Sequence, residues 1–97
     1  MSVQPELSRL IQAALPYAPE AQALAESILN GTNVSYSPAE RKALRRLSRI
    51  EGSDRNRIEF VATQIVVNAG QAARSQDTGA LQCVRNGVTN LIRLTRS

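Results

Sequence analysis

The chain has 97 residues, a net charge of +4 and an apolar content of 42%, and only three of its residues are aromatic. This length suffices to bury one core, so we expect one helical domain over residues 1–97. The chain has no histidine and one cysteine, which removes the commonest general base and excludes a cysteine-based zinc cluster. We expect no metal site and no cofactor. Without a secretion signal or a membrane-spanning apolar run, the expected location is cytoplasmic.

The first forty residues predict two helices. Apolar side chains at helical spacing between residues 7 and 15 predict a helix that starts near Pro5. A second helix is predicted over residues 19–29, with a proline at its start and the pair Asn30–Gly31 suited to a left-handed C-cap. Residues 32–36 form the longest predicted loop.

A third helix is predicted to start at a capping box, in which Ser37 is the N-cap, Pro38 the first helical residue and Glu40 the N3 residue. We expect this helix to end at Gly52. Its predicted apolar arc holds Ala43, Leu44, Leu47 and Ile50. The opposite arc holds the basic residues Arg41, Lys42, Arg45, Arg46 and Arg49.

The fourth helix is predicted from Asp54 to Arg74, with Ser53 as its cap. One face is apolar, but Phe60 and Val67 lie on the other side, which should be exposed. A helix that is apolar on two sides is typically central in a bundle or shared with a partner. We also expect Gly70 to contact the last helix, predicted over residues 79–96.

These elements predict an all-α fold, a compact bundle of four to five helices with a central helix near residues 54–74.

The stretches SPAERKAL, RIEFVATQIVVNAGQAA and QCVRNGVTNLIRLT resemble the helical pattern of phycobiliproteins over about half of the chain. The resemblance implies that Ile65, Asn68 and Ala69 belong to the middle helix of that family. It further implies that Cys83 is the bilin-attaching cysteine and Arg85 the arginine that binds a bilin propionate. Asn86 stands where the family has aspartate, the segment between residues 68 and 83 is much shorter, and the family's later helices are absent. Taken without the resemblance, Cys83 is expected to be a partly buried residue with no special chemistry.

The acidic residues are scattered, and the five glycines are isolated rather than gathered in a phosphate-binding loop. We therefore expect no enzymatic activity. The preferred hypothesis is a small adaptor or regulator that binds a protein, either an acidic partner or a second copy of the chain. Its predicted binding residues are Phe60, Val67, Arg41, Arg45 and Arg49.

The alternative hypothesis is a regulatory protein that binds DNA or RNA. Eleven of the twelve basic residues lie within residues 41–97, and arginine binds phosphate with two parallel hydrogen bonds. The residues predicted for this role are Arg41, Lys42, Arg45, Arg46, Arg49, Arg55 and Arg57. The long apolar segment after the turn at Gly52 suits a core better than a DNA groove.

Overall fold

The computed structural model describes residues 4–96, and within them the expected all-α bundle is confirmed, with no strand. The helices are α1 (Gln4–Ala14), α2 (Gln22–Leu29), α3 (Pro38–Ile50), α4 (Arg57–Ser75) and α5 (Thr78–Arg96). Two short 3-10 turns, Leu15–Tyr17 and Pro19–Ala21, link α1 to α2. Residues 1–3 and 97 of the expected domain lie outside the described range.

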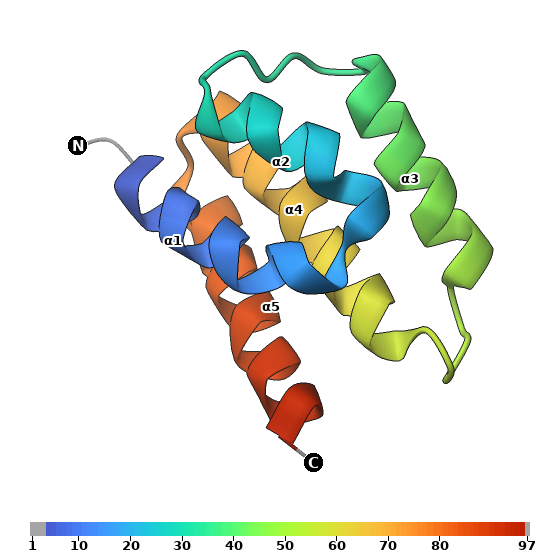
Figure 1. Ribbon diagram of the computed structural model, residues 1–97. Coiled ribbons are helices and arrows are strands. Elements are labelled where there is room, and N and C mark those ends of the chain that lie inside the picture. The colour runs from blue at the N-terminus through green and yellow to red at the C-terminus, as the bar shows by residue number, and fades with distance from the viewer. Residues whose placement is uncertain (1–3, 97) are drawn as a thin grey trace.

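α4 is the central helix, as the sequence predicts, because it packs against the other four helices. Figure 1 shows α1 and α2 lying across one face of α4, with α3 along one side and α5 along the other. α1 also contacts α5, and α2 contacts α3. These contacts close the bundle on one face of α4 only.

The core collects the apolar face of every helix. The fully buried larger side chains are Leu7, Ile11, Leu24, Ile28, Ile65, Val66, Val84 and Thr63. α3 contributes less than predicted, since Ala43 and Ile50 are buried, whereas Leu47 is half-buried and Leu44 is 40% exposed. α3 therefore rests against the bundle along a narrow strip.

α4 and α5 pack closely at Gly87. A Cβ at this position would lie 2.8 Å from Cγ1 of Ile65, so a side chain there would require Ile65 or its helix to shift. The expected contact of Gly70 with the last helix is wrong. Gly70 instead faces Asn33, in the loop between α2 and α3, and Ile28 of α2.

Two of the predicted helix ends are confirmed and three differ. α2 begins at Gln22, after the 3-10 turn, rather than at Pro19, and α3 ends at Ile50 rather than Gly52. Gly31 has φ +74°, as expected after α2, and the Ser37 hydroxyl accepts the Glu40 backbone N–H at 3.2 Å. However, α4 begins at Arg57 rather than Asp54, because residues 51–56 form successive turns. Ser53 does not cap α4; the N-cap residue is Asn56.

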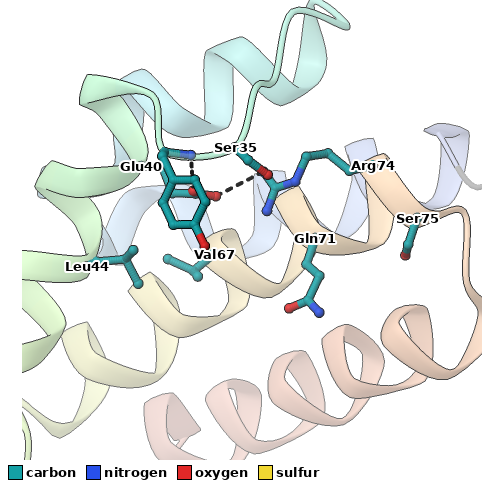
Figure 2. Close-up of a pocket in the computed structure, with 8 residues that line it drawn as sticks. Ser35, Glu40, Leu44, Val67, Gln71, Arg74 and Ser75 are labelled. Atoms are coloured by element: carbon teal, nitrogen blue, oxygen red, sulfur yellow. Dashed lines mark hydrogen bonds and ion pairs between the residues drawn. The ribbon is translucent and has the colours of Figure 1, made fainter.

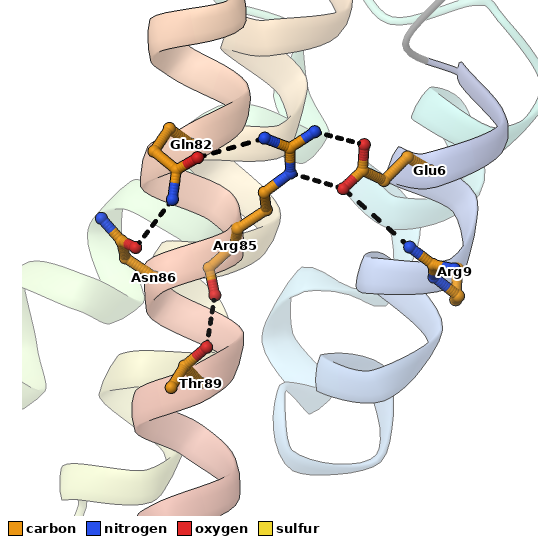
Figure 3. A network of polar contacts seen from close by, with 6 residues as sticks. All are labelled: Glu6, Arg9, Gln82, Arg85, Asn86 and Thr89. Carbon is orange, nitrogen blue, oxygen red and sulfur yellow. Dashed lines mark hydrogen bonds and ion pairs between the residues drawn. The ribbon is translucent and has the colours of Figure 1, made fainter.

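An ion pair joins the first helix to the last (Figure 3). Arg85 donates to both carboxylate oxygens of Glu6, at 2.5 and 2.7 Å, and Gln82 accepts a further bond from Arg85. The hydrogen bond from Arg85 holds the pKa of the Glu6 carboxyl below its usual value. This bridge supports the α1–α5 contact from its solvent side.

Candidate functional site

The face of α4 that α1 and α2 leave uncovered carries a groove between α3 and α4, which we call the α3–α4 groove. Its volume is about 540 Å³. Figure 2 looks onto this face, with Leu44 on α3 and Val67, Gln71 and Arg74 on α4. The groove is lined by Ser35, Tyr36, Glu40, Leu44, Val67, Gln71, Arg74 and Ser75.

Tyr36 stands at the edge of this groove in a strained backbone conformation. Its φ is +62°, in the left-handed region that a bulky residue rarely adopts. Two side chains of α3 hold it: Glu40 accepts the Tyr36 N–H at 2.7 Å, and Arg41 donates to the Tyr36 carbonyl at 2.6 Å. The side chain is nevertheless 74% exposed. Strained residues fixed by their neighbours concentrate at functional sites.

A buried carboxylate forms the inner wall of the groove. Glu40 is only 5% exposed, and its Oε2 lies 2.9 Å from Nη1 of Arg74. The same nitrogen of Arg74 bonds Oδ1 of Asn33, whose amide donates to the Gly70 carbonyl at 2.8 Å. These bonds tie the 32–36 loop and the start of α3 to the last turns of α4, so the groove is preformed.

Phe60 and Val67, the two apolar residues predicted to bind a partner, lie on the uncovered face of α4. With Gln64 and Gln71 they recur at helical spacing, and we call these four residues the open face of α4. Phe60 and Val67 are half-buried and pack on the core, whereas the two glutamines are exposed. Val67 lines the α3–α4 groove, and Phe60 lines a second cavity of about 250 Å³ near the turn at Gly52.

The structure separates the arginines predicted to flank these residues. Arg41 lies beside the groove through its bond to Tyr36. Arg45 and Arg49 are on the outer side of α3, where they line a different cleft with Glu20. Of the five residues proposed for protein binding, Phe60, Val67 and Arg41 therefore belong to one side of the molecule, and Arg45 and Arg49 to another.

The basic residues proposed for nucleic acid are likewise divided. Lys42 pairs with Glu20 at 3.5 Å, and Arg46 makes two bonds to Glu59, at 2.6 and 2.9 Å. This contact lowers the pKa of the Glu59 carboxyl. Arg55 and Arg57 are exposed, and Arg57 lines the cavity that contains Phe60.

Leu44 is a site residue that the sequence interpretation missed. Its place in the apolar arc of α3 predicts a core residue, but it lies at the edge of that arc and lines the groove. The burial of Glu40 was also missed, because its partner Arg74 lies far along the chain. No local pattern reports such a contact.

Of the residues named by the phycobiliprotein resemblance, Cys83 and Arg85 lie on α5, and Ile65, Asn68 and Ala69 lie on α4. Cys83 is exposed, so the expectation of a partly buried thiol is wrong. The Arg85 guanidinium donates hydrogen bonds to both carboxylate oxygens of Glu6. The residues Ile65 and Ala69 are buried in α4 and serve the core.

Comparison with models of protein families, with curated proteins and with solved structures gives no match to this chain. Within residues 4–96, no three histidine, cysteine, aspartate or glutamate side chains are placed to hold a metal ion. None of the described helices combines the length and the apolar character needed to cross a bilayer.

Proposed function

We propose that the protein is a non-enzymatic binding module that takes an acidic amphipathic helix of a partner protein along the open face of α4. One observation carries the proposal: a preformed groove beside α4 is edged by Tyr36, an exposed aromatic residue held in a strained conformation. Helices commonly bind in such grooves through apolar side chains at positions i, i+3, i+4 and i+7.

The dimensions of the open face suit a short helix. From Phe60 to Gln71, α4 rises by about 16 Å, or roughly three helical turns. Val67 and Leu44 offer apolar surface in the groove, and Phe60 offers it at the other end of this face. The exposed amides of Gln64 and Gln71 can hydrogen-bond the polar edge of a bound helix.

Charge favours an acidic partner over a second copy of the chain. Arg74 and Glu40 line the α3–α4 groove, Arg57 and Asp54 line the cavity that contains Phe60, and Arg41 bonds the carbonyl of Tyr36 at the groove edge, so arginines outnumber carboxylates here. Arg41 bonds only a carbonyl oxygen in this region, so its charge remains available. A second copy brings a net charge of +4 and the same arginines, which would repel. Acidic side chains would instead form charge-assisted bonds.

The test is an NMR titration of the labelled chain with a designed helical peptide that carries leucines at i, i+4 and i+7 and flanking glutamates. We expect amide shifts around Tyr36, Val67 and Gln71. The same peptide with lysines in place of the glutamates should shift none of them. The absence of shifts at these residues with the acidic peptide would overturn the proposal.

Leu44→Asp is the variant of choice, because Leu44 is exposed enough to be changed without loss of the core, unlike Phe60 or Val67. We expect it to weaken peptide binding by about tenfold or more, since each 1.4 kcal/mol of lost contact changes affinity by that factor. The matched control is Ile92→Asp on α5, whose side chain is 43% exposed and which should leave binding unchanged. Light scattering on both variants adds a second readout, because a dimer that Leu44→Asp dissociates would assign the groove to a second copy.

A further inference from the structure

A cleft distinct from both the α3–α4 groove and the cavity that contains Phe60 lies on the outer side of α3, and basic residues form most of its lining. Its volume is about 260 Å³. We call it the basic cleft, and its lining residues are Glu20, Lys42, Arg45, Arg46 and Arg49. Four cationic side chains thus meet around one carboxylate, which comes from the 3-10 turn Pro19–Ala21.

Internal ion pairs compensate only half of this charge. Glu20 pairs with Lys42, and Glu59 holds Arg46 from the α4 side. Arg45 and Arg49 are exposed and form no ion pair with any residue in the described range 4–96. They are four positions apart on α3, so their like charges lie about one turn from each other and destabilise the helix slightly when no anion is bound.

We propose that the basic cleft binds closely spaced phosphate groups. Two parallel N–H groups of an arginine match two oxygens of a phosphate, and Arg45 and Arg49 both have free donors. Arg46 is already oriented by its two bonds to Glu59. The lining contains no apolar side chain, so nothing in the cleft would bury the apolar part of a peptide. This site is separate from the α3–α4 groove and does not depend on the function proposed for it.

The experiment measures binding of two phosphate sources by the whole chain, inorganic tripolyphosphate by calorimetry and a labelled random duplex DNA by fluorescence anisotropy. Poly-glutamate serves as an anion without phosphate. The test variant is R45E/R49E, and the matched control is R93E/R96E, which changes the net charge equally on the exposed last turns of α5. We expect R45E/R49E to weaken binding by about tenfold or more and R93E/R96E by about threefold or less, because only the former removes phosphate contacts. With DNA, the slope of log K against log salt should also fall by about two.

Glu20→Gln supplies a test in the opposite direction. It removes the single carboxylate that lines the cleft and frees Lys42, so phosphate binding should strengthen several-fold.

Binding of tripolyphosphate alone would identify a small polyphosphate as the ligand, and binding of DNA alone would identify the phosphate backbone of nucleic acid. Either result supports the proposal if R45E/R49E weakens that binding by about tenfold or more. Equal losses in R45E/R49E and R93E/R96E would overturn it, as would poly-glutamate binding as tight as that of the phosphates.

Discussion

The two long sides of α4 are joined to their neighbours in different ways. Toward α5 the contact is apolar and so close that Gly87 leaves no room for a side chain beside Ile65. Toward α3 the contact is bridged by charged side chains at two places, Glu40 to Arg74 and Glu59 to Arg46. Ion pairs can hold two helices together at a distance, whereas apolar packing requires them to touch. Both cavities assigned to binding lie on or beside α3, the loosely packed side.

The largest expected effect comes from truncation on the α5 side. Ile65→Ala should lower the free energy of unfolding by about 2–5 kcal/mol, because it leaves a cavity in a closely packed region. Leu44→Ala, on the α3 side, should cost only about 0.5 kcal/mol, as is usual for an exposed position. Urea denaturation of both variants measures the difference. Similar losses would mean that α3 packs as closely as α5.

A second substitution tests whether the close packing of α4 against α5 is due to the contact between Ile65 and Gly87. In the natural chain, Gly87→Ala places its Cβ against Ile65, so crowding opposes the better helix propensity of alanine. In the Ile65→Ala background, the side-chain atoms of Ile65 that crowd this Cβ are absent. Gly87→Ala should then stabilise the protein by about 1 kcal/mol, because alanine has the higher helix propensity. Additive effects of the two substitutions would show that they do not touch.

A smaller effect is expected from the charged bridge on the α3 side. Glu40→Ala removes the acceptor of the Tyr36 N–H and the carboxylate partner of Arg74, and should cost about 1.5–3 kcal/mol, the range for hydrogen bonds to charged groups. The control is Glu26→Ala, at an exposed glutamate of α2 that forms no ion pair within residues 4–96. We expect this control to change stability by about 0.5 kcal/mol at most.

The loss of stability in Glu40→Gln should lie between the losses in Glu40→Ala and Glu26→Ala, because the amide oxygen of glutamine can still accept the Tyr36 N–H. All three variants are compared by urea denaturation at neutral pH. If Glu40→Ala is as stable as Glu26→Ala, the bridge does not hold α3 in place.

The same difference between the two sides explains what the sequence could predict. Apolar periodicity predicted the five helices and the central place of α4, because burial imposes that periodicity. The N-cap at Ser37 could be predicted because Ser37 and Glu40 are neighbours in the chain. The other half of the predicted capping box is wrong, since the Glu40 side chain accepts the Tyr36 N–H instead of the Ser37 N–H. The groove was not predicted, since it depends on Glu40 meeting Arg74 across 34 positions and on Leu44 lying at the edge of its apolar arc. The grouping of Arg45 and Arg49 with Glu20, away from Phe60, follows from how α3 is rotated on the bundle, which helical periodicity alone left open.

The smallest expected effect tests the strain at Tyr36. Glycine adopts positive φ freely, whereas a side chain in this region costs about 1–2 kcal/mol. Tyr36→Gly should therefore be more stable than Tyr36→Ala by about 1 kcal/mol in urea denaturation. The same two substitutions at Gln71, an exposed position inside α4, should rank in the opposite order, with glycine less stable by about 1 kcal/mol. The same order at both positions would mean that Tyr36 is not strained. If Tyr36→Gly is the more stable variant and yet binds the acidic peptide less well, the chain gives up stability at this position to place an aromatic ring beside the groove.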